Sequence, residues 1–159
     1  MPKVFLICGK ICSGKSTYAD ELRKEYHAVI LSVDEITLAL FGQNAGDRLD
    51  AYVEKAKAYL YKKSLEIIST GINVVIDWGF WTRMEREYAR QFYSSRNVET
   101  VFCYIDVDPE QWQERIHSRN AAALAHESNT YYVDESLAEK AAALFEMPDK
   151  QEMDIWLTQ

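Results

Sequence analysis

Short apolar runs alternate with amphipathic stretches along the chain. Apolar runs of about four to eight residues, bounded by turn-forming residues, are typical of buried strands. The pattern predicts strands at Lys3–Cys8, His27–Ser32, Asn73–Ile76 and Thr100–Ile105, with a short edge strand at Asp154–Leu157. Because nearly every position in the first four is apolar, both faces of their sheet are expected to be covered.

Between the predicted strands, apolar residues recur every three or four positions, which is the period of an α-helix. The predicted helices are Lys15–Glu25, Glu35–Phe41, Arg48–Ser69, a helix capped by Thr82 that runs to about Ser95, Pro109–Arg119 and Asp134–Phe145. Thr82 and Glu85 have the spacing of a capping box, and Gly71 follows the longest helix, where a C-terminal cap is expected. Residues 120–132 are the least regular segment, although their alanines are compatible with a helix.

This alternation predicts the α/β class, a mostly parallel sheet of four to five strands in a three-layer α/β/α sandwich. The length of 159 residues is typical of one domain, so residues 1–159 are expected to form a single unit. In such sheets, ligands bind at the carboxyl ends of the strands. The polar residues that follow the predicted strands are therefore the first candidates for chemistry.

Composition narrows the possible partners. Asp and Glu number 25 against 18 Lys and Arg, and the formal charge of −7 disfavours binding along a nucleic-acid strand, which depends on Lys and Arg. One phosphate in a local pocket stays compatible with that charge. No apolar run approaches the roughly 20 residues needed to cross a bilayer, so no membrane partner is expected. The three cysteines lack metal-site spacing, and we expect a cytoplasmic protein with free thiols.

The segment Gly9–Ser16, GKICSGKS, matches the phosphate-binding pattern GxxxxGK[ST] between a predicted strand and a predicted helix. Gly9 and Gly14 allow the backbone amides to face phosphate oxygens, and the helix N-terminus adds positive potential. Lys15 is expected to contact the β- and γ-phosphates, and the Ser16 hydroxyl to bind Mg²⁺. The residues expected to bind the nucleotide are Gly9, Lys10, Ile11, Cys12, Ser13, Gly14, Lys15, Ser16 and Thr17. Cys12 is interpreted as a packing residue, with a redox-sensitive thiol as the alternative.

Two carboxylates follow predicted strands. Asp34 comes just after the second strand, where it can act as a general base toward a substrate hydroxyl, or simply cap the next helix. Asp77 comes directly after the third strand, where it can hold Mg²⁺ through water, or cap a turn. Both are expected to face the phosphate loop, because the carboxyl ends of parallel strands meet at one edge of the sheet.

Aromatic and basic residues follow Asp77. Trp78, Phe80 and Trp81 can line an acceptor pocket or pack in the core, as large aromatic residues commonly do. Arg83, at the start of the next helix, can reach a substrate anion or lie in solvent.

Arg115 and Arg119 are four residues apart and share one face of a predicted helix. Together with the irregular segment after them they predict a small helical lid at about residues 115–132, with Arg119 catalytic and Arg115 on the nucleotide. The alternative is a pair of cations favoured by the helix dipole.

With these motifs in order, the chain resembles the small P-loop kinases. These include the kinase domain of polynucleotide kinases, zeta-toxin-like kinases and chloramphenicol phosphotransferase-like proteins. The matching segments are CGKICSGKSTYA, VDE, VVIDWGFWTRMERE, ERIHSRN and YYVDESL. The resemblance implies a P-loop NTPase fold and the use of ATP and Mg²⁺. It also implies the base role for Asp34, the lid role for Arg115 and Arg119, and the carboxylate role for Asp77.

Three functions follow from these expectations. The first is ATP- and Mg²⁺-dependent phosphoryl transfer to a hydroxyl of a small molecule, with Asp34, Trp78, Trp81 and Arg83 toward the acceptor. The second is a kinase for a nucleotide or for the 5′-hydroxyl end of a nucleic acid. The third is an ATP-binding or ATPase switch that has no acceptor.

Overall fold

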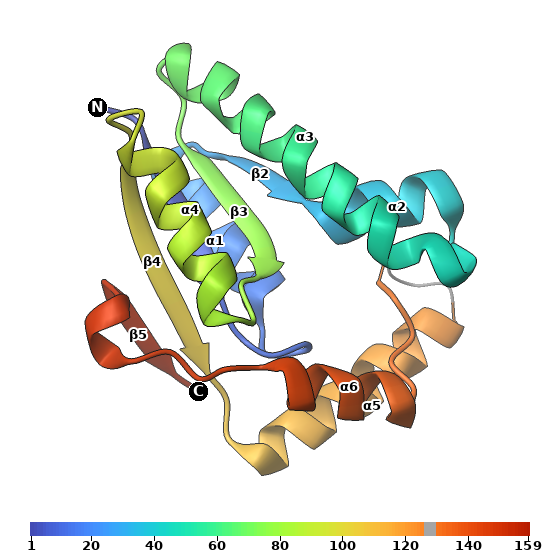
Figure 1. Ribbon diagram of the computed structural model, residues 1–159. Coiled ribbons are helices and arrows are strands. Elements are labelled where there is room, and N and C mark those ends of the chain that lie inside the picture. Colours follow the sequence, from blue (N-terminus) through green and yellow to red (C-terminus); the bar gives the residue numbers. More distant parts are fainter. Residues whose placement is uncertain (126–129) are drawn as a thin grey trace.

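In the computed structural model, which describes residues 1–125 and 130–159, the strands form one parallel sheet (Figure 1). Within those residues the order across the sheet is β2-β3-β1-β4-β5. The strands are β1 Lys3–Cys8, β2 Val29–Ser32, β3 Val74–Gly79, β4 Glu99–Asp106 and β5 Ile155–Thr158. The predicted class and the expected short strand at the edge are therefore confirmed.

The helices occupy the predicted intervals. They are α1 Lys15–Tyr26, α2 Val33–Phe41, α3 Leu49–Ser69, α4 Arg83–Ser94, α5 Pro109–Leu124 and α6 Glu135–Leu144, with short 3₁₀ helices η1 Gly46–Arg48 and η2 Lys150–Glu152. The capping box of Thr82 and Glu85 is present, and Gly71 follows α3 with a φ of 88°, as a C-terminal cap requires. Within the described part of the chain, no helix is long and apolar enough to cross a membrane.

The strand order explains the three layers. The chain moves from β1 to the β2 edge, and then returns through β3 toward β4 and β5 on the other side of β1. Right-handed connections that run in opposite directions place their helices on opposite faces. Accordingly α4 lies in front of the sheet and α1 behind it (Figure 1). The predicted α/β/α sandwich is confirmed.

The alternation of residues along β1 connects the two cores. Val4 and Leu6 point to the face where Leu60 of α3 and Ala89 of α4 pack. The neighbouring Phe5 and Ile7 belong to the second cluster, on the face of α1. Burial on both faces accounts for the uninterrupted apolar sequence of this strand.

Several element boundaries differ from the sequence prediction. The second strand begins at Val29 rather than His27, because His27 has a φ of 51° and caps α1. The third strand continues to Gly79, so Asp77 lies inside it, with Trp78 bulged out of register against β1. Helix α5 continues five residues past its predicted end at Arg119, so the helical option for the first part of the irregular segment is correct. Of the predicted lid, residues 126–129 lie outside the described residues.

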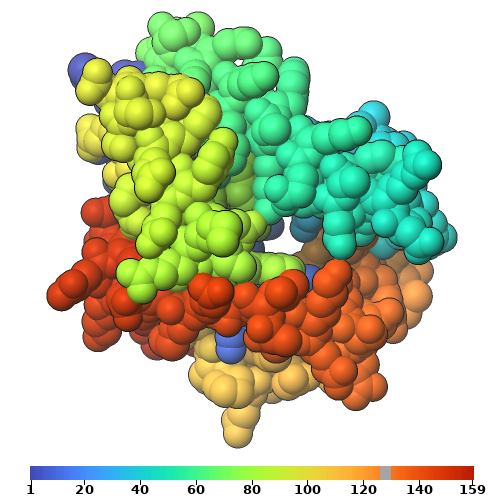
Figure 2. Space-filling model, in the orientation of Figure 1, coloured from blue at the N-terminus to red at the C-terminus, as the bar shows by residue number. Residues whose placement is uncertain are grey.

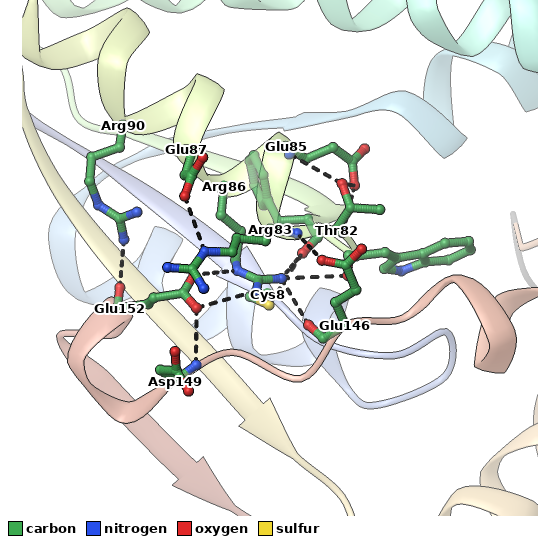
Figure 3. A network of polar contacts seen from close by, with 12 residues as sticks. Cys8, Thr82, Arg83, Glu85, Arg86, Glu87, Arg90, Glu146, Asp149 and Glu152 are labelled. Carbon is green, nitrogen blue, oxygen red and sulfur yellow. Dashed lines mark hydrogen bonds and ion pairs between the residues drawn. The ribbon is translucent and has the colours of Figure 1, made fainter.

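A buried arginine joins the end of β3 to the C-terminal segment (Figure 3). The Arg86 side chain is 1% exposed, and its Nε donates to Glu152 Oε2 at 2.8 Å. Its Nη1 also donates to the carbonyl oxygens of Phe80 and Glu146, at 3.2 and 2.9 Å. The hydrogen bond from Arg86 lowers the pKa of Glu152, so the pair is charged near neutrality. Arg86 therefore fixes the turn that leads from β3 to α4.

We predict that Arg86→Ala lowers the free energy of unfolding by roughly 3–5 kcal/mol, because one member of a buried ion pair is left without its partner. Urea denaturation measures this. Arg83→Ala is the matched control, since Arg83 lies on the same helix in an exposed pair with Glu87, and it should leave stability nearly unchanged. Equal losses in the two variants would contradict the structural role of Arg86.

Candidate active site

A cleft of about 1490 Å³ opens at the carboxyl ends of β1, β2 and β3. In Figure 2 the surface is hollowed between α3, drawn green to teal, and α6, drawn orange to red. Ligand pockets usually measure roughly 300–1,000 Å³, so this cleft has room for more than one small molecule. Its position is the one expected for a parallel sheet whose connections change direction beside β1.

The loop between β1 and α1 has the backbone conformation of an anion-binding nest. Cys12 and Gly14 have φ values of 58° and 97°, in the left-handed region. The Gly9 N–H donates to the Gly79 carbonyl at 3.0 Å, which ties the loop to β3. The φ of Gly14 disfavours any other residue there, and a Cβ would also lie 2.8 Å from Arg115 Nη1, so the Arg115 side chain would have to shift. Alternating left-handed residues turn successive amides inward, an arrangement that binds phosphate.

Lys15 extends across the mouth of this loop. Its Nζ donates to the Lys10 carbonyl at 2.5 Å. Burial lowers the pKa of Lys15, while the carboxylates of Asp77 and Asp34 oppose that shift. The Ser13 hydroxyl is fully buried and finds no hydrogen-bond partner among the described residues. The loop therefore presents a cation and inward-facing polar groups to one point, which is what a polyphosphate requires.

Ser16 and Asp77 meet at the start of α1. The Ser16 hydroxyl donates to Asp77 Oδ2 at 2.9 Å, and Asp77 is 8% exposed. A turn cap, the alternative considered for Asp77, does not fit, because this residue lies within β3. Among the described residues no three His, Cys, Asp or Glu side chains could hold a metal by themselves. Mg²⁺ usually takes one or two protein oxygens and completes its shell with water and phosphate, and this pair fits that pattern.

Asp34 occupies the first turn of α2 and faces the cleft. The helix is capped by Ser32, whose Oγ accepts from the Glu35 N–H at 3.3 Å, so the capping alternative for Asp34 is wrong. Its side chain keeps 61% exposure because the cleft is open to water. The protein around the cleft reduces the hydration of the Asp34 carboxylate and so raises its pKa, and the charges of Arg119 and Lys15 act in the opposite direction.

Both arginines of α5 reach the phosphate loop. Arg119 Nη2 lies 4.0 Å from Asp34 Oδ2, and its Nη1 is 3.4 Å from Cys12 Sγ. Arg115 Nη1 donates to the Ser13 carbonyl at 2.5 Å, and Nη2 to Gln159 Oε1 at 2.8 Å. Since α5 continues to Leu124, Arg119 is not in its last turn, and the helix-dipole interpretation does not apply to it.

The residues after β3 divide between the cleft and the rest of the protein. Trp78 and Trp81 line the cleft, and the buried Trp81 Nε1 has no hydrogen-bond partner within the described chain. Phe80 is fully buried, so for this residue the alternative of packing in the core is correct. Arg83 does not line the cleft: it lies in solvent, with Nε donating to Glu87 at 3.1 Å. The expectation that Arg83 faces a substrate anion is therefore not supported by its position.

For the other residues at the site, the sequence patterns predict no functional role. Trp112 Nε1 donates to the Ile11 carbonyl at 2.6 Å and holds the loop against α5. The Tyr131 hydroxyl donates to Thr37 Oγ1 at 2.7 Å, which joins the segment after α5 to the helix that bears Asp34. Lys57 of α3 lies at the cleft wall against Glu85. Lys57 lies four residues after Val53 and three before Leu60, at the edge of the apolar face of the helix, and no sequence motif marks it.

A family model described as "AAA domain" matches residues 4–148. The chain belongs to this family. No curated protein sequence matches it significantly.

Solved structures with a similar fold include kinases. A protein of Chloroflexus aurantiacus has a TM-score of 0.74 and 17% identity, with 99% of this chain and 84% of that chain covered. The APS kinase of Mycobacterium tuberculosis, in complex with AMPPNP and APS, has a TM-score of 0.68 and 18% identity over 99% and 88% of the two chains. A chain of the Pnkp1/Rnl/Hen1 RNA repair complex has a TM-score of 0.71 and 22% identity over 90% and 43%. The expected relation to P-loop kinases is confirmed at the level of family and fold.

The position of Arg119 predicts the titration of Asp34. Arg119→Ala should raise the pKa of Asp34 further, because it removes the largest charge that favours the ionised carboxylate. Carbon-13 NMR titration of the Asp34 carboxyl group measures the shift. Arg115→Ala is the control. Arg115 lies one turn earlier on α5 and contacts Ser13 and Gln159, so its removal should leave the pKa of Asp34 unchanged. An Asp34 pKa that does not move in Arg119→Ala would contradict the contact.

Proposed function

We propose that this protein is an ATP- and Mg²⁺-dependent phosphotransferase that acts on a hydroxyl group of a small molecule. The observation that carries the proposal is the convergence of Lys15, Asp34 and Arg119 on one part of the cleft. Arg119 is 4.0 Å from Asp34, and the charges of both Lys15 and Arg119 act on the pKa of Asp34. Asp34 is a second carboxylate, in addition to Asp77, beside the phosphate cations, and there it can accept the proton of an acceptor hydroxyl.

In this proposal the loop from Gly9 to Thr17 binds the phosphates of ATP. Backbone amides and the N-terminus of α1 hold the β-phosphate, and the Lys15 ammonium neutralises charge on the transferring group. Ser16 and Asp77 hold Mg²⁺, which, when bound, neutralises negative charge on the phosphate oxygens.

Asp34 is proposed as the general base. The acceptor oxygen attacks the γ-phosphorus, the bond from that phosphorus to the ADP oxygen breaks, and the acceptor proton passes to the Asp34 carboxylate. Asp34 also orients the hydroxyl for in-line attack, which matters because a loose transition state depends mainly on positioning. Trp78 and Trp81 supply apolar surface for the body of the acceptor.

We propose the described parts of residues 115–132 as a lid over this site, within one kinase domain that spans residues 1–159. Arg119, between the loop and Asp34, stabilises charge in the transition state, and Arg115 holds the loop on the nucleotide side. Tyr131 follows the gap in the described residues and contacts the helix that bears Asp34. The free cysteines support the expected cytoplasmic location.

Assays of phosphate transfer from ATP also distinguish the two other functions expected from the sequence. Transfer to a 5′-hydroxyl oligonucleotide or to a nucleotide would indicate the second function expected from the sequence. ATP binding with slow hydrolysis and no acceptor would indicate a switch. The net charge of −7 disfavours a nucleic-acid strand as substrate.

Lys15→Ala should lower phosphoryl transfer by roughly 10²–10³-fold, because it removes a cation at the group where charge develops. The rate of ADP release with acceptor pools measures this. Lys24→Ala is the control, since Lys24 is exposed on the same helix, α1, and does not line the cleft. If both variants lose the same activity, Lys15 has no special role.

Asp34→Asn should reduce kcat by about 10²-fold or more while ATP affinity changes little, because a base acts only in the transfer step. Isothermal titration with an ATP analogue and steady-state kinetics separate the two effects. An unchanged rate of acceptor phosphorylation in Asp34→Asn would show that Asp34 is not the general base.

A further inference from the structure

A short segment, residues 130–133, connects α2, which carries the proposed base, with α5, which carries the two arginines of the site. We call this segment the strap. On the side of α2, the Gln43 side chain makes two hydrogen bonds with the backbone of the strap, at 2.8 and 3.2 Å. On the side of α5, the Asn120 side chain makes two with the backbone of Val133, at 2.6 and 2.7 Å. The backbone of the strap is therefore fixed to both helices.

Tyr131, within the strap, contacts both helices at the residues proposed to act in transfer. Its hydroxyl donates to Oγ1 of the buried Thr37 at 2.7 Å. The Thr37 hydroxyl donates in turn to the backbone carbonyls of Val33 and Asp34, at 3.0 and 3.3 Å. The main-chain carbonyl of Tyr131 accepts from Arg119 Nε at 3.2 Å. One residue therefore links the helical turn that carries Asp34 to the side chain of Arg119.

Arg119 and Asp34 face each other without forming a close ion pair. Arg119 Nη2 lies 4.0 Å from Asp34 Oδ2. Hydrogen bonds between arginine and a carboxylate usually measure about 2.7–2.9 Å. The Nε of Arg119 is engaged by the Tyr131 carbonyl, and Nη1 lies 3.4 Å from Cys12 Sγ. Because the guanidinium group is planar and rigid, contacts at Nε and Nη1 also set the position of Nη2. The strap carbonyl therefore contributes to the separation of the two charges.

A close ion pair would deprive both groups of their proposed roles. A carboxylate that accepts two hydrogen bonds from arginine has a lowered pKa and is a weaker base. The guanidinium group in turn would have fewer N–H groups left for the oxygens of the transferring phosphoryl group. At a separation of 4.0 Å the charge of Arg119 still acts on Asp34, while each group keeps its hydrogen-bonding capacity for the substrates.

We propose that Tyr131 is a positioning residue that holds Arg119 apart from Asp34, so that the acceptor hydroxyl and the transferring phosphoryl group can enter between them. This inference rests on the proposed phosphotransferase function. The Tyr131 hydroxyl holds the strap against α2, and the Tyr131 carbonyl holds the guanidinium group. Burial raises the pKa of the Tyr131 hydroxyl, and the charge of Asp34 acts in the same direction, so this hydroxyl stays protonated and remains a donor.

Removal of the Tyr131 hydroxyl tests the position of Arg119 without any ligand. In Tyr131→Phe the strap loses a contact with α2, Arg119 closes on Asp34, and the pKa of Asp34 should fall. Carbon-13 NMR titration of the Asp34 carboxyl group measures this shift. The other charges that act on this carboxyl group come from Lys15, Asp77 and Lys57. When Tyr131→Phe is added to Arg119→Ala, the pKa of Asp34 should stay at its value in Arg119→Ala, because the effect passes through the guanidinium group. A wild-type pKa of Asp34 in Tyr131→Phe would overturn the inference.

Thr37→Val removes the other partner of the same hydrogen bond and keeps the shape of the side chain. It should lower the pKa of Asp34 as Tyr131→Phe does, and the double variant should lower it no further, because both changes break one contact. Tyr132→Phe is the matched control, since Tyr132 is the next residue of the strap, is 44% exposed and does not line the cleft. Additive shifts in the double variant, or an equal shift in Tyr132→Phe, would overturn the inference. Thermal unfolding shows whether each variant remains folded.

Nucleotide binding tests whether the separation of the two charges serves phosphoryl transfer. ADP with aluminium fluoride and Mg²⁺ mimics the transition state, whereas AMPPNP mimics bound ATP. Tyr131→Phe should weaken binding of the transition-state mimic roughly tenfold and leave AMPPNP binding unchanged, because the phosphate loop is not altered. Isothermal titration measures both affinities. Equal binding of the mimic by the wild type and Tyr131→Phe would overturn the inference and leave the proposed function in place. A wild-type protein that binds AMPPNP but not the mimic would contradict the proposed function, and the inference would fail with it.

Discussion

The parallel pairing of β1 with β3 sets the distances on which the cleft depends. Ile7 is paired with Asp77, and one step further Cys8 is paired with Gly79, because Trp78 is bulged out. This register places the Gly9 amide on the Gly79 carbonyl and brings Asp77 within 2.9 Å of the Ser16 hydroxyl. A shift by one residue would turn Asp77 to the opposite face of the sheet. The phosphate loop and its carboxylate partner are therefore consequences of one strand pairing.

The turn at the end of β3 explains why the charged side chain of Arg86 is buried. Gly79 and Phe80 both have positive φ, so the chain leaves β3 through an unusual turn whose carbonyl groups need partners. Arg86 supplies hydrogen bonds to the Phe80 carbonyl and to Glu146, and its charge is compensated by Glu152. Removing the ion pair would leave these groups unsatisfied. The arrangement fixes Trp81 at the wall of the cleft.

Charge divides the cleft into two unlike halves. On the side of the loop, Lys15, Arg115 and Arg119 surround the backbone amides, an environment suited to polyphosphate. On the side of α3, Lys57 is held by Glu85 and Glu54, so the surface there is acidic. Asp34 lies where the two halves meet. An overall acidic protein can therefore hold a phosphate locally, because its cations gather at the phosphate loop.

The class of fold, the phosphate loop and most helix boundaries could be predicted from the amino-acid sequence. Strand burial, helix period and capping pairs such as Thr82 with Glu85 are local properties, readable from residues close together in the chain. It also placed Asp34, Asp77 and the two arginines at the correct edge of the sheet, because parallel strands end at one edge.

The role of each of these residues, where the sequence allows two, depends on contacts between distant parts of the chain. Ser32, not Asp34, caps α2, and Arg83 lies in solvent whereas Arg86, three residues later, is buried. No local pattern distinguishes the two arginines, because the partner of Arg86 is 66 residues away. The pairing of Lys57 with Glu85 likewise joins two helices across the cleft. Such contacts depend on register and helix packing, which bring together residues whose spacing in the chain carries no period.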